Sequence, residues 1–121
     1  MKKYNSVIQN YRMISRNEKK GWPELAQVHS AAAIGIDLED NVLFILSRAA
    51  YSVHDLILIL LELPIRIRDA MYVEGGSEAT LYYKLNNKGV ITHSNSDPAR
   101  SQKRREDWAE LPNMVGIAKR E

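Results

Sequence analysis

One apolar helical segment stands between two strand-like segments, and this order limits the folds that the chain can adopt. We predict the helix in YSVHDLILILLELP, where Ser52 is a favoured N-cap and Asp55 completes a pattern like the capping box. Residues 56–61 are apolar on every side, so we expect the helix to be covered on most faces until Pro64 ends it. Strand, helix and strand in succession predict a crossover unit with the helix packed on a sheet.

Two hairpins are predicted, one on each side of this helix. In SAAAIGIDLEDNVLFILS, residues 32–38 and 42–46 form the strands, and residues 39–41 form the turn because Asp and Asn tolerate left-handed backbone. In ATLYYKLNNKGVITHS, residues 81–85 alternate as they would in a strand, and residues 86–89 have the turn chemistry of a hairpin.

The remaining segments complete the predicted fold class. Residues 6–15 read as a strand, with Val7, Gln9, Tyr11 and Met13 on one face and Ile8, Asn10, Arg12 and Ile14 on the other. We expect loops in RNEKKGWPEL and in the polar residues 95–110, and a final short strand in LPNMVGIAKR. The prediction is therefore an α/β (α+β) domain over residues 1–121, with a mixed, largely antiparallel sheet and one principal buried helix.

Composition excludes several classes of function. A chain of 121 residues fits one domain, and its net charge of +2 is too small to indicate a nucleic-acid partner or an anionic membrane. There is no cysteine, which excludes disulfides and thiolate metal sites. The N-terminus MKKYNSVIQNYRMIS lacks an apolar region after its positive start, so we expect a soluble protein without an export signal, in no particular compartment.

The stretch DAMYVEGGSEATLYY carries the clearest chemical signal. Gly75 and Gly76 permit backbone conformations that other residues avoid, and they let a ligand approach main-chain N–H groups. Glu74 and Glu78 flank the two glycines, and two carboxylates at one cleft can divide acid and base roles. The alternative is a tight turn between two strands with solvated glutamates.

The segment IRDAMYVEGGSEATLYY resembles the signature of the phosphodiester glycosidase family, in which an apolar strand is followed by an acid, Gly-Gly and a further strand. The order of the other elements agrees. AAAIGIDLEDNVLFILS is similar to the family's Ala-Ile-Gly hairpin, YSVHDLILILLELP to the helix before the signature, and LPNMVGIA to the closing strand. The resemblance runs from about Ser6 to Ala118. Family domains are longer, so the chain resembles the C-terminal half of one.

The resemblance implies a hydrolase that cleaves a sugar from a sugar-1-phosphodiester. Glu74 and Glu78 would perform or orient proton transfer, Gly75 and Gly76 would shape the pocket, and Arg48 would bind the phosphate. Better-known members carry Arg-Thr before Ala-Ile-Gly, where this chain has Ala31 and Ala32, and Glu74 replaces the commoner Asp. The alternative is therefore a non-catalytic remnant that binds a carbohydrate or phosphosugar.

Other residues are weaker candidates. Arg48 lies between a predicted strand and the helix start, where helix N–H groups also favour phosphate, although it is otherwise an ordinary surface arginine. His54, in the first helical turn, is a candidate acid or base or else a partly exposed histidine. Asn10 and Arg12 project from one strand face and are candidates to line the cleft.

Partner expectations follow from the same reading. The ligand is a sugar phosphodiester, and we expect no cofactor, no metal, no nucleic acid and no membrane. The basic cluster at 100–105 is followed directly by Glu106 and Asp107 and has no interleaved aromatics, so a solvated surface is favoured over a nucleic-acid patch. A half-domain would expose a sheet edge and apolar faces, which predicts a homo-oligomer or a partner that completes the sheet.

Overall fold

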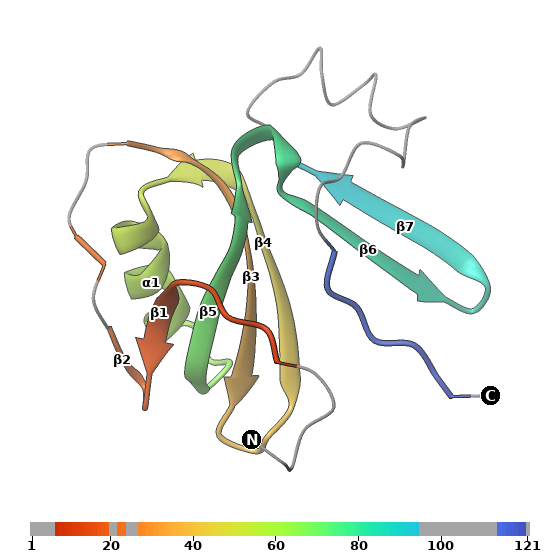
Figure 1. Ribbon diagram of the computed structural model, residues 1–121, viewed down its shortest axis with the longest axis horizontal. Coiled ribbons are helices and arrows are strands. Elements are labelled where there is room, and N and C mark those ends of the chain that lie inside the picture. The colour runs from red at the N-terminus through yellow and green to blue at the C-terminus, as the bar shows by residue number, and fades with distance from the viewer. Residues whose placement is uncertain (1–6, 20–21, 24–26, 95–113, 121) are drawn as a thin grey trace.

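The computed structural model describes residues 7–19, 22–23, 27–94 and 114–120, which form a sheet, a helix and a separate hairpin (Figure 1). This confirms the α+β class. In chain order the elements are β1 Arg12–Ser15, β2 Glu18–Lys19, β3 His29–Asp37, β4 Val42–Tyr51, α1 Val53–Glu62, β5 Ile67–Gly75, a 3-10 turn Gly76–Glu78, β6 Thr80–Leu85 and β7 Lys88–His93.

The main sheet has five strands in the order β2-β1-β5-β3-β4, and each pairing is antiparallel. Because β4 and β5 are both antiparallel to β3, they run parallel to each other. The connection through α1 therefore crosses over β3, as the order strand, helix, strand predicts. The second sheet consists of β6 and β7 alone, and this hairpin stands to one side of the main sheet (Figure 1).

The helix begins where its N-cap predicts. The Ser52 hydroxyl accepts a hydrogen bond from the Asp55 N–H at 3.0 Å, so Ser52 is a cap. Buried residues of α1 and of the sheet face beneath it form the core: Met13, Ile14, Ala31, Ala33, Val53, Leu56, Ile57, Leu60, Ile67 and Ala70. Leu58 is 43% exposed, so the helix is covered on one side only, which corrects the expectation of cover on most faces. A two-layer domain leaves the outer side of its helix in water.

Both hairpin turns form at the predicted residues. Asp40 has a φ of 66°, and Asn86 and Asn87 have φ values of 50° and 63°, the left-handed conformations that these residue types tolerate. The second turn needs only these two asparagines, because Lys88 and Gly89 already belong to β7. The first hairpin is longer than predicted, because β4 continues to Tyr51.

The predictions for both ends of the chain need correction. Only Arg12–Ser15 of the first predicted strand is a strand, and a register shift between Arg12 and Ile14 buries Met13 and Ile14 together, which breaks the expected alternation. Glu18–Lys19 is a short strand within the predicted loop. Residues 114–120 form no strand, and the rest of the predicted last strand and the polar segment lie outside the described residues. Within the described ranges, α1 has ten residues and does not reach across a bilayer.

The sheet has two unlike faces. α1 covers the face that carries Ala31, Ala33 and Ala70. The opposite face, here called the open face, carries Ile34 and Ile36, and residues 8–10 pass over it before β1 begins (Figure 1). A pocket of about 500 Å³ lies between that segment and the sheet.

Candidate functional site

The Gly-Gly turn and Arg48 lie at the same end of the sheet. Ala31 of β3 pairs with Gly75 on one side and with Ser47 on the other, so these three residues form one row across the sheet. Arg48 follows Ser47 and is two strand spacings, roughly 10 Å, from the glycine. We call this region the glycine end: Glu74, Gly75, the turn Gly76–Glu78, and Ser47–Arg48 of β4.

Glu74 projects on the open face. Its cross-strand partner is Ala32, whose neighbours on the same face of β3 are Ile34 and Ile36. The Glu74 carboxylate accepts a hydrogen bond from the Gly75 N–H at 3.0 Å, which fixes its position beside the glycine pair. Burial raises the pKa of the Tyr72 phenol, and the negative charge of Glu74 raises it further. The charge of Glu74 therefore acts on the Tyr72 phenol.

The two glycines are required for different reasons. A Cβ atom on Gly75 would collide with the Tyr72 hydroxyl and would lie 3.0 Å from the His29 ring, so the space holds only a hydrogen atom. Gly76 has a φ of +68°, and no heavy atom lies within 4 Å of where its Cβ would stand. The main chain at Gly76 is thus open to a ligand, and Glu78, partly buried, follows on the 3-10 turn.

A buried polar network fixes Arg48 to the second hairpin. The Ser94 hydroxyl donates to Ser30 Oγ at 2.7 Å, and the Ser30 hydroxyl donates to the Arg48 carbonyl at 2.6 Å. Arg48 Nε donates to the His93 carbonyl at 3.2 Å. Ser30 and Ser94 are buried and lie 64 residues apart in the chain, and neither carries a sequence signal that would predict the pairing. A cluster of this kind emerges only when the fold brings both hairpins together.

His54 belongs to the helix start rather than to the strands of the glycine end. It lies in the first turn of α1, its side chain is 16% exposed, and its Nδ1 is 3.4 Å from Asp55 Oδ1. Because β4 ends at Tyr51 opposite His29, the helix start does lie near the glycine end of the sheet.

Asn10 and Arg12 line the open-face pocket. Asn10 Nδ2 donates to the Val73 carbonyl at 3.3 Å, so Asn10 reaches β5 beside Glu74. The pocket-lining residues are Ile8, Gln9, Asn10, Arg12, Ile14, Ser15, Ile34, Gly35, Ile36, Val42, Asp69, Ala70 and Met71. Neither Glu74 nor Glu78 is among them, so the pocket adjoins the glycine end rather than enclosing it.

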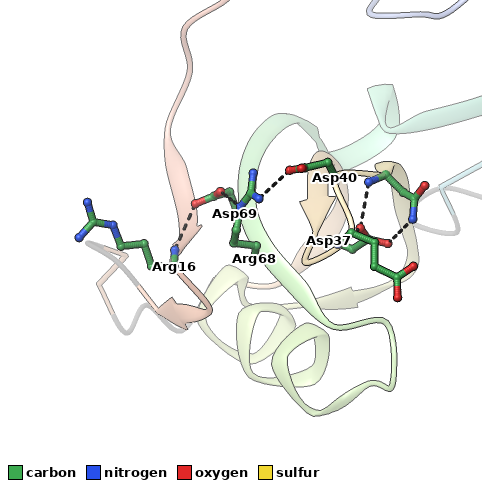
Figure 2. Close-up of polar contacts among 7 residues, drawn as sticks. Arg16, Asp37, Asp40, Arg68 and Asp69 are labelled. Atoms are coloured by element: carbon green, nitrogen blue, oxygen red, sulfur yellow. Dashed lines mark hydrogen bonds and ion pairs between the residues drawn. The ribbon is translucent and has the colours of Figure 1, made fainter.

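The opposite end of the sheet holds a second group of charged residues, the aspartate end: Asp37, Asp40, Arg68 and Asp69 (Figure 2). Arg68 joins Asp40 at 2.7 Å and Asp69 at 2.8 Å, and Asp69 also accepts the Arg16 N–H at 3.1 Å. The hydrogen bond from Arg68 has the largest effect on Asp69 and lowers its pKa, and the bond from the Arg16 N–H lowers it further. Hydrogen bonds from Asn41 lower the pKa of Asp37. Across the described part of the chain, no three His, Asp or Glu side chains gather as metal ligands would.

Comparison with known proteins identifies the relationship of this chain. The family model described as phosphodiester glycosidase matches residues 3–118, which is nearly the full length. No curated protein and no solved structure matches the chain.

Proposed function

This chain belongs to the phosphodiester glycosidase family, and from that membership we propose that it is a hydrolase that releases a sugar from a sugar-1-phosphodiester. The observation that carries the proposal is the match over residues 3–118, because it includes the glycine end and its carboxylates. The placement of Glu74 on the open face, held by the Gly75 N–H, supports a role for this carboxylate in the reaction.

In the proposed mechanism, Glu74 and Glu78 perform or orient proton transfer. Cleavage of the bond between the sugar and the phosphate oxygen needs a proton donor for the leaving oxygen or a base for the attacking water. Two carboxylates on either side of the turn at Gly76 are in a position to divide these tasks. The open space around Gly76 lets the reacting atoms approach the main chain.

Arg48 is the proposed cation for the phosphate at this end. Its Nε bond to the His93 carbonyl orients the guanidinium, which suits it to a planar, charged contact with a phosphate oxygen. His54 is a further candidate acid or base, because the helix start lies at the same end of the sheet.

One observation favours a second candidate function, binding without turnover. Ala31 is 1% exposed and pairs with Gly75. It stands where the better-known members carry the Arg of Arg-Thr, so this chain offers no basic side chain at that position. A pocket that lacks this cation would still hold a phosphosugar through Arg48 while catalysing its cleavage poorly.

Release of free sugar from an N-acetylglucosamine 1-phosphodiester tests the choice between the two functions. We expect turnover by the unaltered chain and its loss in Glu74→Gln, with Glu39→Gln as the control because Glu39 is exposed at the other end of the sheet. Saturable binding of the diester without any released sugar would replace the hydrolase by the binding function.

We also propose that the chain associates with a second copy through β4. This strand is the last of the five-stranded sheet, and its residues Val42, Phe44 and Tyr51 are between 37% and 45% exposed. An exposed edge strand of ten residues invites strand addition by another chain. Sedimentation should give a dimer that Phe44→Lys dissociates, and a monodisperse monomer across concentrations contradicts the proposal.

A further inference from the structure

The open-face pocket has an aliphatic floor. Ile34, Ile36 and Met71 come from the central strands, Val42 from the edge strand, and Ile8 from the segment above. Its volume of about 500 Å³ falls within the range of roughly 300–1,000 Å³ that is usual for small-molecule sites. A pocket of this size and lining offers dispersion contacts over most of its floor.

The polar residues of the pocket are Gln9, Asn10, Arg12, Ser15 and Asp69. Arg12 pairs with Met71 and Asn10 reaches the Val73 carbonyl, so both lie on the side of the floor toward Glu74. Asp69 lies farther along the floor, and its carboxylate is held by Arg68 and the Arg16 N–H (Figure 2). The charged residues of the described pocket lining are Arg12 and Asp69, and the Asp69 carboxylate is paired with Arg68.

The spacing between the pocket and Glu74 matches the link of a sugar phosphodiester. Ala32, opposite Glu74, and Ile34, opposite Met71, are two residues apart on β3, which is roughly 7 Å along an extended strand. With a sugar ring at Glu74, the group on the far side of the phosphate would enter the aliphatic pocket.

We propose that this pocket holds the hydrocarbon chain of a sugar phosphodiester, so that the substrate is a sugar-1-phosphate esterified to an apolar alcohol. This inference rests on the proposed function. A second sugar in the pocket would bury hydroxyl groups against aliphatic side chains, which is costly without hydrogen-bond partners. A hydrocarbon chain gains from the same burial.

The test compares two probes, N-acetylglucosamine 1-(methyl phosphate) and 1-(octyl phosphate), on the full chain. Calorimetric binding and release of free sugar are both measured for each probe. Each fully buried methylene strengthens binding by roughly fourfold, so burial of two or three of them predicts an octyl probe bound at least about tenfold more tightly.

Variants of the pocket test whether the octyl group of the probe binds there. Val42→Thr keeps the shape of the side chain and adds a hydroxyl to the floor, whereas Ile36→Thr adds a hydroxyl and also removes the terminal methyl group. Each should narrow the ratio between octyl and methyl binding. Val90→Thr is the matched control, because Val90 is 38% exposed on β7 outside the pocket, and it should leave the ratio unchanged.

The outcomes separate this inference from the proposed function. Turnover of both probes with equal binding overturns the apolar pocket and leaves the hydrolase intact. Tighter octyl binding without released sugar supports the pocket and overturns the hydrolase. If the preference for the octyl probe survives both Val42→Thr and Ile36→Thr, the octyl group binds elsewhere and the inference is overturned.

Discussion

The two ends of the five-stranded sheet use the same kinds of charged residue in different ways. At the aspartate end, Asp37 accepts hydrogen bonds from the Glu39 N–H and from the Asn41 N–H and amide group, and Arg68 bridges Asp40 and Asp69 (Figure 2). At the glycine end, Glu74 accepts the N–H of the next residue, and the neighbouring backbone at Gly76 is open. The first arrangement ties a turn to the sheet, and the second leaves room for a ligand.

Exposure and charge alone therefore do not distinguish a carboxylate that stabilises the fold from one that takes part in a reaction. The aspartates bind groups that belong to adjacent strands and turns, so their interactions stabilise the fold. Glu74 sits where a bulge in β5, a row of small residues and a left-handed glycine remove side chains from the surroundings. Matched substitutions at the two ends test whether the glycine end serves a ligand and the aspartate end serves the fold.

The largest expected effect concerns turnover. Glu74→Gln should lower the rate of sugar release by a factor on the order of 10² to 10⁴, the usual contribution of a general acid or base. Asp40→Asn makes an acid-to-amide change at the other end, outside the pocket, and should change the rate less than about twofold, since surface pairs contribute little. The measurement is the rate of sugar release at saturating phosphodiester. Equal losses of rate in both variants would contradict the different roles of the two ends.

The next effect concerns stability at the two glycines. Gly75→Ala should lower the free energy of unfolding by about 1–3 kcal/mol, because its methyl group collides with the Tyr72 hydroxyl and crowds His29. Gly76→Ala meets no neighbouring atom and should cost only the left-handed backbone, about 1 kcal/mol. Urea unfolding of both variants measures the difference. A larger cost at Gly76 would mean that the space around it is not open.

A third, smaller effect separates two arginines. Arg48→Gln should raise the KM for the phosphodiester by roughly tenfold, the value of one charge-assisted hydrogen bond to phosphate. Arg66→Gln removes an exposed arginine at the aspartate end, where its partner is Glu39, and should leave KM unchanged. Steady-state kinetics on both variants gives the answer, and an unchanged KM in Arg48→Gln would remove Arg48 from the phosphate site.

The smallest effect is a pH dependence of stability at the aspartate end. Because folding lowers the pKa of Asp69 and of Asp37, the stability from their ionised forms is complete above the unfolded value of 3.8 and is lost as pH falls through the folded pKa. Asp69→Asn should therefore lower the melting temperature at pH 7 by a few degrees at most, and the deficit should shrink as pH falls below 3.8 through the folded pKa. A deficit that persists in acid would point to packing rather than charge.

Local signals in the sequence predicted the elements whose formation is local. The cap at Ser52, the turn at Asp40 and the pair Asn86-Asn87 depend on hydrogen bonds and backbone angles within a few residues, and each formed as predicted. The crossover also followed from element order alone. The family resemblance was likewise confirmed by the match over residues 3–118.

Features set by register and long-range packing were not predictable in this way. The register shift in β1 buries Met13 and Ile14 side by side, and nothing in the alternation of residues 6–15 indicates it. The extension of β4 to Tyr51 and the bond between Ser30 and Ser94 depend on neighbours far along the chain. The open-face pocket arises from residues 8–10 lying over β3 and β5, which required the structure. The roles of Glu74, Glu78 and His54 stay predictions.

Amide chemical shifts recorded during titration with N-acetylglucosamine 1-(methyl phosphate) test most directly whether the glycine end is where the ligand binds. We predict saturable shifts at Gly75, Gly76 and Glu78, with the signals of Asp40 and Asn41 unchanged. Shifts that saturate at Asp40 and Asn41 while the glycine signals stay in place would contradict the account.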